Sequence, residues 1–264
     1  MASFIKLNVM PSWNTSQYLQ FADERTRPAK DLIQRIALGQ PGRIIDLGCG
    51  PGNSTAALID RWPDATTTGL DHSPDMITAA KNSYPKNQWI TGDIASWTPD
   101  QPYDLIFSNA ALQWVPEHRA LLPRLIRQVA PGGALAVQVP ANLAAPAHRL
   151  MRELAASPAW QNHFPRQVRE WLVHDPAFYY DVLSPLAGRI DLWTTEYMHV
   201  MVGPDAIVEW YKGTGLRPFL DLLSPVDQPH FLTDYRALLA SAYPRRADGR
   251  VIFPFLRLFF IAYL

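Results

Sequence analysis

The first half of the chain alternates short apolar runs with segments whose apolar residues recur at helical spacing. Apolar or β-branched runs that end at glycine or an acidic residue predict strands at 43–48, 66–70 and 88–91, and two further apolar runs predict strands at 103–107 and 134–139. Helical spacing predicts helices at 54–62, 74–83 and 116–129. Short strands that alternate with helices are typical of a parallel sheet covered by helices on both faces, so the expected fold class is α/β.

The second half breaks this alternation. Short helices are predicted at 146–156, 165–173, 176–183, 205–211 and 227–242, and β-rich segments at 190–202 and 252–263. We therefore expect helical insertions after the fifth strand and between the sixth and seventh. The expected organisation is an N-terminal helical cap or lid (1–40), a ligand-binding core (41–140), and insertions plus closing strands of the same sheet (141–264), all within one domain.

Composition excludes several classes of protein. Hydrophobic residues make up 48% and charged residues 18% of the chain, which excludes a mainly disordered protein. Lys+Arg and Asp+Glu are both 24, so no overall field attracts nucleic acid or an anionic membrane, and we predict neither as a partner. No oligomeric state is predicted.

The number of cysteines and the spacing of the histidines indicate whether the chain can bind a metal ion, and its apolar segments indicate its cellular location. The single cysteine, Cys49, excludes an internal disulfide and a cysteine-rich zinc site, and no two of the seven histidines are four residues apart. We therefore predict no metal. The N-terminus has no apolar signal-peptide region, and the apolar run at 253–264 is too short to span a bilayer, so we expect a cytoplasmic protein.

The sharpest motif follows the first predicted strand, where residues 46–54 read DLGCGPGNS. Its glycines, Gly48, Gly50 and Gly52, permit positive φ and close approach to a ligand, and the helix that follows directs N–H groups at a carboxylate or phosphate. The spacing is G-x-G-x-G and not the G-x-G-x-x-G of dinucleotide-binding enzymes. Asp46 would repel a pyrophosphate but suits an ammonium group, so an amino acid moiety fits this turn.

Two further acids follow the next two strands. Asp71 lies 71 − 50 = 21 residues after Gly50, where a ribose hydroxyl acceptor is expected. Asp93 is suited to accept from an adenine amine. Each feature alone has an ordinary structural explanation as a tight turn or a helix cap. Together, in this order, they indicate a ligand with amino acid, ribose and adenine parts, which is S-adenosylmethionine.

These segments resemble the motifs of class I S-adenosylmethionine-dependent methyltransferases. The resemblance is carried by 44–52 (IIDLGCGPG), 69–76 (GLDHSPDM), 92–94 (GDI) and 103–110 (YDLIFSNA). It implies a Rossmann-like, seven-stranded, mostly parallel sheet whose last strand is antiparallel, with S-adenosyl-L-homocysteine as the product. The cofactor-binding residues that we expect are Trp13, Tyr18, Arg27, Asp46, Gly48, Gly50, Gly52, Asn53, Ser54, Asp71, His72, Ser73, Met76, Asp93, Ile94, Asn109, Ala110 and Trp114, with Tyr18 on a lid.

The outer segments narrow the resemblance to trans-aconitate 2-methyltransferases. It extends from about residue 13 to 262 and includes 109–115 (NAALQWV), 179–183 (YYDVL), 213–220 (GTGLRPFL) and 253–260 (FPFLRLFF). Residues 108–114 (SNAALQW) also resemble the malonyl-acyl-carrier methyltransferases, which likewise esterify a carboxyl group. The resemblance therefore implies methylation of a small polycarboxylic acid. A carboxyl methyltransferase for another free or carrier-bound acid, or another small-molecule O-methyltransferase, is the alternative.

Transfer to a carboxylate needs no general base, because carboxyl groups are ionised at pH 7, so no catalytic residue is nominated. Arginine suits a carboxylate ligand, and Arg217 and Arg257 each interrupt an apolar run, although a structural salt bridge would explain them equally well. The substrate-binding candidates are Gln113, Trp114, His118, Tyr179, His199, Trp210, Arg217 and Arg257.

Three other functions can be compared with the features of this sequence. A nucleic-acid methyltransferase would require a basic face and aromatic residues for an extruded base. A binding protein without turnover would share the cofactor motifs. A metal-dependent catechol-type enzyme would require acids clustered beside Asp93, which the sequence lacks.

Overall fold

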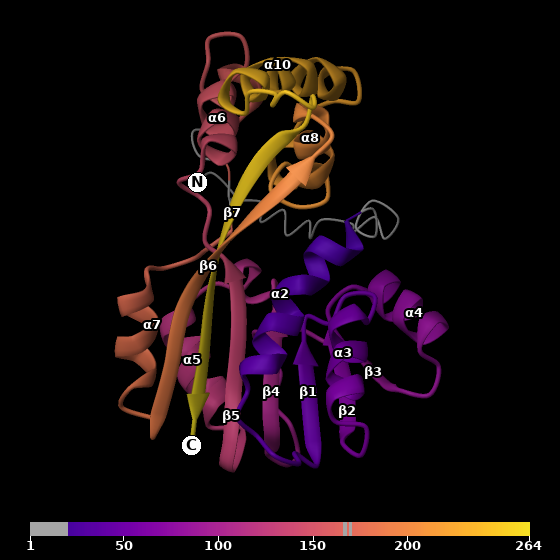
Figure 1. Cartoon of the computed structure of the whole chain (residues 1–264), viewed down its shortest axis with the longest axis vertical. Helices are drawn as coiled ribbons and strands as arrows, with labels where there is room; N and C mark the ends of the chain where they lie inside the picture. Colours follow the sequence, from indigo (N-terminus) through magenta and orange to yellow (C-terminus); the bar gives the residue numbers. More distant parts are fainter. Residues whose placement is uncertain (1–20, 166–167, 169–170) are drawn as a thin grey trace, which may run out of the picture.

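The computed structural model describes residues 21–165, 168 and 171–264. In this part of the chain seven strands form one sheet in the order β3-β2-β1-β4-β5-β7-β6 (Figure 1). The strands are β1 (Arg43–Leu47), β2 (Thr66–Asp71), β3 (Gln88–Thr91), β4 (Tyr103–Asn109), β5 (Val129–Pro140), β6 (Arg189–Met201) and β7 (Val251–Tyr263). The first five pair in parallel, and β7 runs antiparallel to both β5 and β6. This is the predicted sheet with its antiparallel last strand.

Helices connect most of these strands. They are α2 (Ala22–Arg35), α3 (Asn53–Arg61), α4 (Pro74–Ser83), α5 (His118–Ile126), α6 (Pro146–Ala155), α7 (Pro176–Leu183), α8 (Pro204–Lys212), α9 (Arg217–Leu220) and α10 (Asp227–Ala242), with short 3₁₀ turns η1 (Leu112–Trp114) and η2 (Gln161–His163). Helices α6 and α7 follow β5, and α8 to α10 lie between β6 and β7. The two predicted insertions are therefore confirmed.

Local sequence explains where these helices begin. Ser73 is the N-cap of α4 and its hydroxyl accepts from the Met76 N–H at 3.4 Å, while Pro74 occupies the first turn, as predicted. Helix α3 begins at Asn53; its N-cap is Gly52, which has a left-handed conformation, and no side chain caps its first turn. The free N–H groups of that turn therefore face the glycine turn.

Two apolar clusters cover the two faces of the sheet. On one face, α5 and α7 pack against residues such as Phe260; on the other, α2 and α3 pack against residues such as Phe259. These adjacent β7 residues point to opposite faces because side chains alternate along a strand.

A third cluster forms a separate lobe, which we call the helical lobe and which comprises α6, α8, α9, α10 and the first half of β7 with the end of β6. Strand β5 pairs with β7 only from Arg257 onward, whereas β6 pairs with β7 along its whole length. The β6–β7 ribbon therefore extends beyond the sheet into the helical lobe (Figure 1). There Phe253, Trp210, Phe231 and Tyr235 are almost fully buried.

One predicted helix is wrong. The described residues of segment 165–173, namely 165, 168 and 171–173, lie outside any helix. The Leu172 N–H donates instead to the Gln113 carbonyl at 2.7 Å, and the Trp171 ring packs edge-on against Trp114. Tertiary contacts override the helical spacing of this segment. In residues 21–165, 168 and 171–264, no helix has the length and apolar character needed to cross a bilayer.

Candidate active site

A row of buried polar side chains crosses one face of the sheet, at the carboxyl ends of β1, β4 and β5 and at the adjoining position on the antiparallel β7. Asp46, Asn109, Gln138 and Arg257 belong to β1, β4, β5 and β7, and their exposed fractions are 0%, 9%, 0% and 4%. Asn109 is directly opposite Gln138, and Arg257 is opposite Pro140. We call these four residues the polar row. By alternation they share the face that α2 and α3 cover, which makes this edge a candidate ligand site.

Asp46 lies at one end of the polar row. Its Oδ2 accepts from the Ser54 hydroxyl at 2.6 Å and the Thr55 hydroxyl at 2.7 Å, whereas Oδ1 is buried without a hydrogen-bond partner. Burial raises the pKa of this carboxyl to about 6, although the two hydroxyl groups oppose the rise and nearby Asp71 adds to it. A buried carboxylate oxygen without a partner fits an ammonium group, as the sequence predicted for the amino acid part of the cofactor.

The glycine turn brings backbone close to the same place. Gly48, Gly50 and Gly52 have φ values of 77°, 53° and 97°, in the left-handed region. A Cβ on Gly48 would lie 2.1 Å from the Ala111 Cβ, so only glycine fits there. A small cavity of about 20 Å³ lies between this turn and α2. It is lined by Arg25, Thr26, Ala29, Gly48, Cys49, Pro51, Asn53, Ser54 and Asn109.

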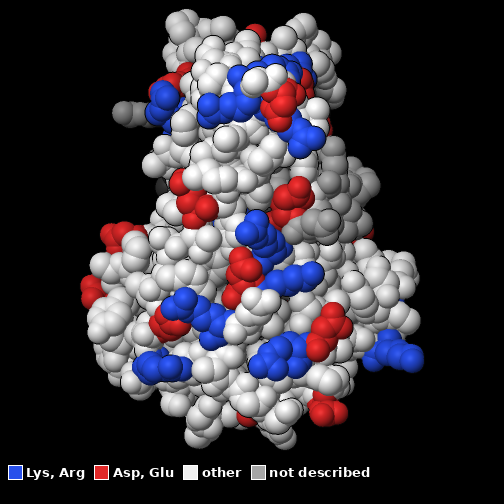
Figure 2. All heavy atoms as spheres, in the orientation of Figure 1, with Lys and Arg blue, Asp and Glu red and all other residues white. Residues whose placement is uncertain are grey.

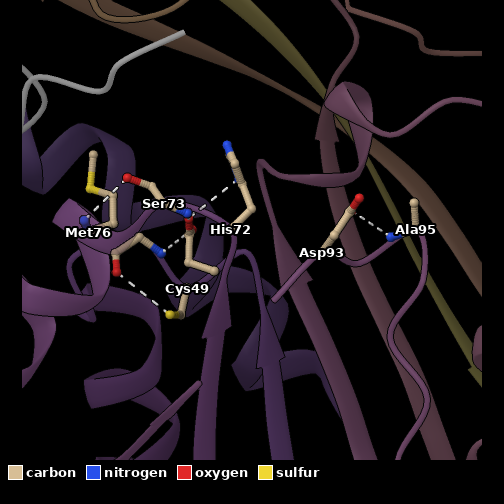
Figure 3. Close-up of polar contacts among 8 residues, drawn as sticks. Cys49, His72, Ser73, Met76, Asp93 and Ala95 are labelled. Carbon is tan, nitrogen blue, oxygen red and sulfur yellow. Dashed lines mark hydrogen bonds and ion pairs between the residues drawn. The ribbon is translucent and has the colours of Figure 1, made fainter. Parts of the chain in front are cut away.

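Asp71 links the glycine turn to the loop after β2 by hydrogen bonds. Its Oδ2 accepts from the Gly50 N–H at 3.0 Å and its Oδ1 from the Ser73 N–H at 2.9 Å, while His72 Nδ1 lies 3.6 Å from Oδ1 (Figure 3). Each carboxylate oxygen retains a lone pair, so ribose hydroxyls can still donate to it. Met76 is buried behind Ser73, in the first turn of α4.

Asp93 lies apart from this group, on the loop that follows β3. Its Oδ1 accepts from the Ala95 N–H at 2.9 Å (Figure 3), and the side chain is exposed. The adjacent Ile94 is 8% exposed and belongs to the apolar cluster on the α5 side. The loop therefore offers an accessible carboxylate beside a buried apolar side chain, which suits a purine ring.

The segment after β4 adds unsatisfied amide oxygens. Ala110 has a φ of 54°, and its carbonyl accepts from Gln113 Nε2 at 2.7 Å. Gln113 Oε1 and Asn109 Oδ1 are buried and have no hydrogen-bond partner among the described residues. Trp114 is half-buried against the Trp171 ring. Of these residues, Asn109 also lines the small cavity beside the glycine turn.

The other end of the polar row meets the helical lobe. Arg257 Nη1 donates to Gln138 Oε1 at 3.3 Å, and the guanidinium lies 4.6 Å from the centre of the Phe255 ring. His199 is buried beside this group, with its ring centre 5.0 Å from that of Trp210. The structure thus brings three substrate-binding candidates, Arg257, His199 and Trp210, close together.

Arg25 contacts Trp210 and also lines the small cavity beside the glycine turn. Its guanidinium lies 4.8 Å from the Trp210 ring centre, and Nη2 donates to the Trp210 carbonyl at 3.1 Å. Arg25 is 7% exposed, whereas Arg27, the residue expected from the sequence, is exposed and lies over the Tyr197 ring. In the described residues it is therefore Arg25 that lines the cavity.

His118 and Tyr179 lie together but on the opposite face of the sheet. His118 Nε2 donates to the Leu112 carbonyl at 2.8 Å, and its Nδ1 lies 3.0 Å from the Tyr179 hydroxyl. Burial lowers the pKa of His118, which favours the neutral ring that this arrangement requires. The Tyr179 ring stacks on Phe260. The pair supports η1 from the α5 side and is not part of the polar row.

Arg217 is part of neither the polar row nor the His118–Tyr179 pair, but lies in the helical lobe. It belongs to α9, its Nη2 is 4.0 Å from Asp221 Oδ1, and it lines a groove of about 570 Å³ with Lys212 and Arg236 in the helical lobe. Trp13 and Tyr18 lie outside the described residues. No group of three or more His, Cys, Asp or Glu side chains in the described part of the chain is arranged to hold a metal ion.

Arg25 and Gln138 are functional candidates that the sequence reasoning did not single out. Gln138 had a visible signal, because it is the only polar side chain in the apolar run 134–139. Arg25 had none, because a cation near the end of an amphipathic helix usually lies in solvent.

Comparison with known proteins decides the family. A family model described as "Methyltransferase domain" matches residues 44–133. A trans-aconitate 2-methyltransferase of Azoarcus sp. (strain BH72) is 48% identical over 96% of this chain and 99% of its own length. One of Methylobacterium nodulans is 50% identical over 96% of this chain and 98% of its own length. The chain belongs to the trans-aconitate 2-methyltransferase family. It is therefore an S-adenosylmethionine-dependent methyltransferase, as its motifs predicted.

Solved structures agree on the fold. The YcgJ protein of Bacillus subtilis matches with a TM-score of 0.56 and 14% identity over 90% of this chain and 98% of its own. Phosphoethanolamine N-methyltransferase 2 of Haemonchus contortus matches with a TM-score of 0.57 and 15% identity over 94% of this chain and 56% of its own. The class I methyltransferase fold is thus shared at low sequence identity.

Proposed function

We propose that this protein transfers a methyl group from S-adenosylmethionine to one carboxylate of trans-aconitate, giving a monomethyl ester and S-adenosylhomocysteine. The observation that carries the proposal is the polar row. At one end it has an unsatisfied carboxylate oxygen, Asp46 Oδ1, which suits the cofactor's ammonium group. Its other end has the buried guanidinium of Arg257, which suits an anion.

The cofactor would be held by Asp46, the glycine turn, Asp71 and Asp93. When bound, S-adenosylmethionine supplies a sulfonium methyl group that a nucleophile can displace directly. Asp46 would hold the amino acid end, and the free N–H groups at the start of α3 would bind its carboxylate. Asp71 would accept from the ribose while it keeps Gly50 and Ser73 in place.

The residues of the substrate side would act by orientation. The attacking carboxylate is already ionised near neutral pH, so no side chain has to remove a proton. Arg257 and Arg25 would fix the acid, and Gln138 and Asn109 would complete its hydrogen bonds. Holding both reactants in line can supply roughly 7–11 kcal/mol of the rate enhancement. Burial of the row strengthens each of these polar contacts by excluding water.

The alternative is a carrier-bound acid with one free carboxylate, such as a malonyl thioester. Its support is the similarity of segment 108–114 to malonyl-acyl-carrier methyltransferases. The assay measures transfer of labelled methyl to trans-aconitate, cis-aconitate, citrate, isocitrate and a malonyl thioester, and then treats each product with mild base. Labelling of trans-aconitate that mild base removes is the expected result. Labelling of the malonyl thioester alone would replace the proposal with its alternative.

Arg257→Lys tests the substrate side. Lysine keeps the charge but loses the planar pair of donors, so KM for trans-aconitate should rise about tenfold or more with unchanged cofactor affinity. Arg149→Lys is the matched control, because Arg149 is exposed on α6 and paired with Glu153. Arg217→Lys tests the second sequence prediction, since an equal rise in KM would assign Arg217 to the site. Cytoplasmic location stays a prediction that cell fractionation can test.

A further inference from the structure

His199 is a buried histidine with an unsatisfied ring nitrogen. It lies on β6 directly opposite Phe253 of β7 and is 6% exposed. Its Nε2 is fully buried and has no hydrogen-bond partner among the described residues. Buried polar atoms in folded proteins nearly always have a partner, so an atom like this one indicates a ligand.

Aromatic side chains surround the ring. The ring centres of Trp210, Phe255, Phe253 and Tyr197 lie 5.0, 6.1, 6.2 and 6.1 Å from that of His199, and the Tyr197 ring is stacked on it. None of these rings can accept the proton of Nε2 as a carboxylate can. The immediate surroundings of the ring are therefore apolar, and the charged groups around them decide what it binds.

The charged groups that face His199 are mainly cations. Arg257 on β7 and Arg27 on α2 both act on its ring, and Arg25 on α2 lies over the neighbouring Trp210. The acid nearby is Asp31 of α2, and it accepts from the Tyr197 hydroxyl at 2.6 Å. Burial, Arg257 and Arg27, in that order, lower the pKa of His199 to about 4. The ring is thus neutral at neutral pH in the free protein, within a positive environment that favours an anion.

We propose that His199 and Arg257 bind a substrate carboxylate other than the one that is methylated, and that His199 gains a proton as this carboxylate binds. The inference rests on the proposed function and adds a requirement on its substrate: the acid must have at least two free carboxylates. A carboxylate beside the ring reverses the effect of the two arginines, because an adjacent negative charge stabilises the imidazolium.

Strand order explains why this carboxylate is not the one that receives the methyl group. The cofactor cavity is lined by Asn109 of β4, and β6 lies three positions further along the sheet, after β5 and β7. A carboxylate held at His199 is therefore the distal one. The reacting carboxylate would lie nearer Asn109 and Gln138. A carrier-bound acid with a single carboxylate would leave His199 without its ligand.

Calorimetry tests the proton uptake directly. Trans-aconitate is titrated into protein saturated with S-adenosylhomocysteine, so that no turnover occurs, near pH 6.5 in two buffers of different ionisation enthalpy. The wild type should take up a substantial fraction of a proton per substrate bound. His199→Gln keeps a side-chain donor but cannot titrate, so its uptake should disappear. His230→Gln, at an exposed position on α10, is the matched control and should behave as the wild type.

Kinetics give the second readout. Between the pKa of His199 in the free protein, about 4, and its higher pKa in the complex, KM of the wild type should rise by up to about tenfold per pH unit, and this slope should be absent in His199→Gln. Unchanged affinity for S-adenosylhomocysteine in His199→Gln shows that this variant is folded. If it does not fold, His199→Asn replaces it in both experiments.

Equal proton uptake in wild type and variant, or none in either, overturns the proposal and leaves His199 as a core residue. That result is separate from failure of the proposed function. In the latter case wild-type protein would neither bind nor methylate trans-aconitate.

Discussion

At the scale of single residues, Asp46 has two conflicting effects. Its carboxylate is fully buried, so its pKa is raised from 3.8 to about 6, and the folded state holds the proton more tightly than the unfolded chain does. Stability therefore falls as pH rises from 3.8 to about 6, and at pH 7 the free protein bears the full cost of about 3 kcal/mol. A bound ammonium group would offset this cost.

Asp46→Asn should separate the two effects. An asparagine oxygen can still accept from Ser54 and Thr55, so the free protein should melt at a higher temperature at pH 7. Cofactor affinity should nevertheless fall by about 1.5–3 kcal/mol, because a charged hydrogen bond is lost. Thermal denaturation with and without S-adenosylhomocysteine measures both effects. The exposed Asp60→Asn on α3 is the control, and a variant that binds the cofactor normally would remove Asp46 from the site.

The same carboxyl predicts a pH dependence of cofactor binding. Affinity for S-adenosylhomocysteine should be constant above about pH 7 and should weaken as pH falls through about 6, because the protonated carboxyl no longer attracts an ammonium. Equilibrium binding from about pH 5 to 8 measures the curve. Asp46→Asn should bind weakly with little change over this range, and a wild-type curve that is equally flat would contradict the assignment.

At the scale of elements, the glycine turn combines two separate constraints. Gly48 and Gly132 have nearly equal φ values, 77° and 78°, so replacement by alanine strains the two backbones alike. Only at Gly48 does a Cβ also collide, at 2.1 Å from the Ala111 Cβ; at Gly132 nothing lies within 4 Å.

Gly132→Ala should therefore cost about 1–2 kcal/mol of unfolding free energy, from backbone strain alone. Gly48→Ala should cost clearly more and should also weaken cofactor binding, because the turn has to move away from Ala111. Urea denaturation of the two variants, compared with each other, measures the difference. Equal losses in both would show that backbone strain alone sets the requirement for glycine at 48.

Periodicity predicted the elements well where one signal dominated. The runs that became β1 to β4 end at glycine or a polar residue, so their positions could be predicted to within two residues. Strand β5 begins earlier than expected, at Val129, because Gly132 lets the chain turn while Val129 pairs with Tyr103. Segment 165–173 failed because contacts of Trp171 and Leu172 with η1 are invisible to local patterns.

For the candidate site, too, the residues within one local motif could be predicted, and those brought together by tertiary contacts could not. Asp46 and Asp71 could be predicted because the glycine turn fixes them within one short segment. His199 and Arg257 could be nominated as residue types, but their proximity depends on the pairing of β6 with β7 more than fifty residues away. Arg25 and Gln138 were missed because only the packing of α2 against the sheet brings them to the cavity.

At the scale of the whole molecule, positive and negative charges are equal in number. The formal net charge is 0, and Figure 2 shows basic and acidic side chains interspersed over the visible face. The cation of the polar row, Arg257, is buried below this surface. We therefore expect no strong attraction of a polyanion to the outer surface.

A heparin column tests this expectation. The protein should elute at or below about 0.15 M salt, because acidic side chains lie among its surface cations and oppose the binding of a polyanion. Firm retention at higher salt, together with a gel shift of DNA or RNA, would instead favour a nucleic-acid partner.

The position of Cys49 has one more consequence. It is the chain's single cysteine, it is 3% exposed in the centre of the glycine turn, and burial raises the pKa of its thiol. Alkylating reagents attack the exposed thiolate, so modification of the closed protein should be slow. The rate of labelling therefore reports how often the turn opens, with no engineered probe. Saturating S-adenosylhomocysteine should slow it further, and mass spectrometry of the intact chain would time the opening of the cofactor pocket.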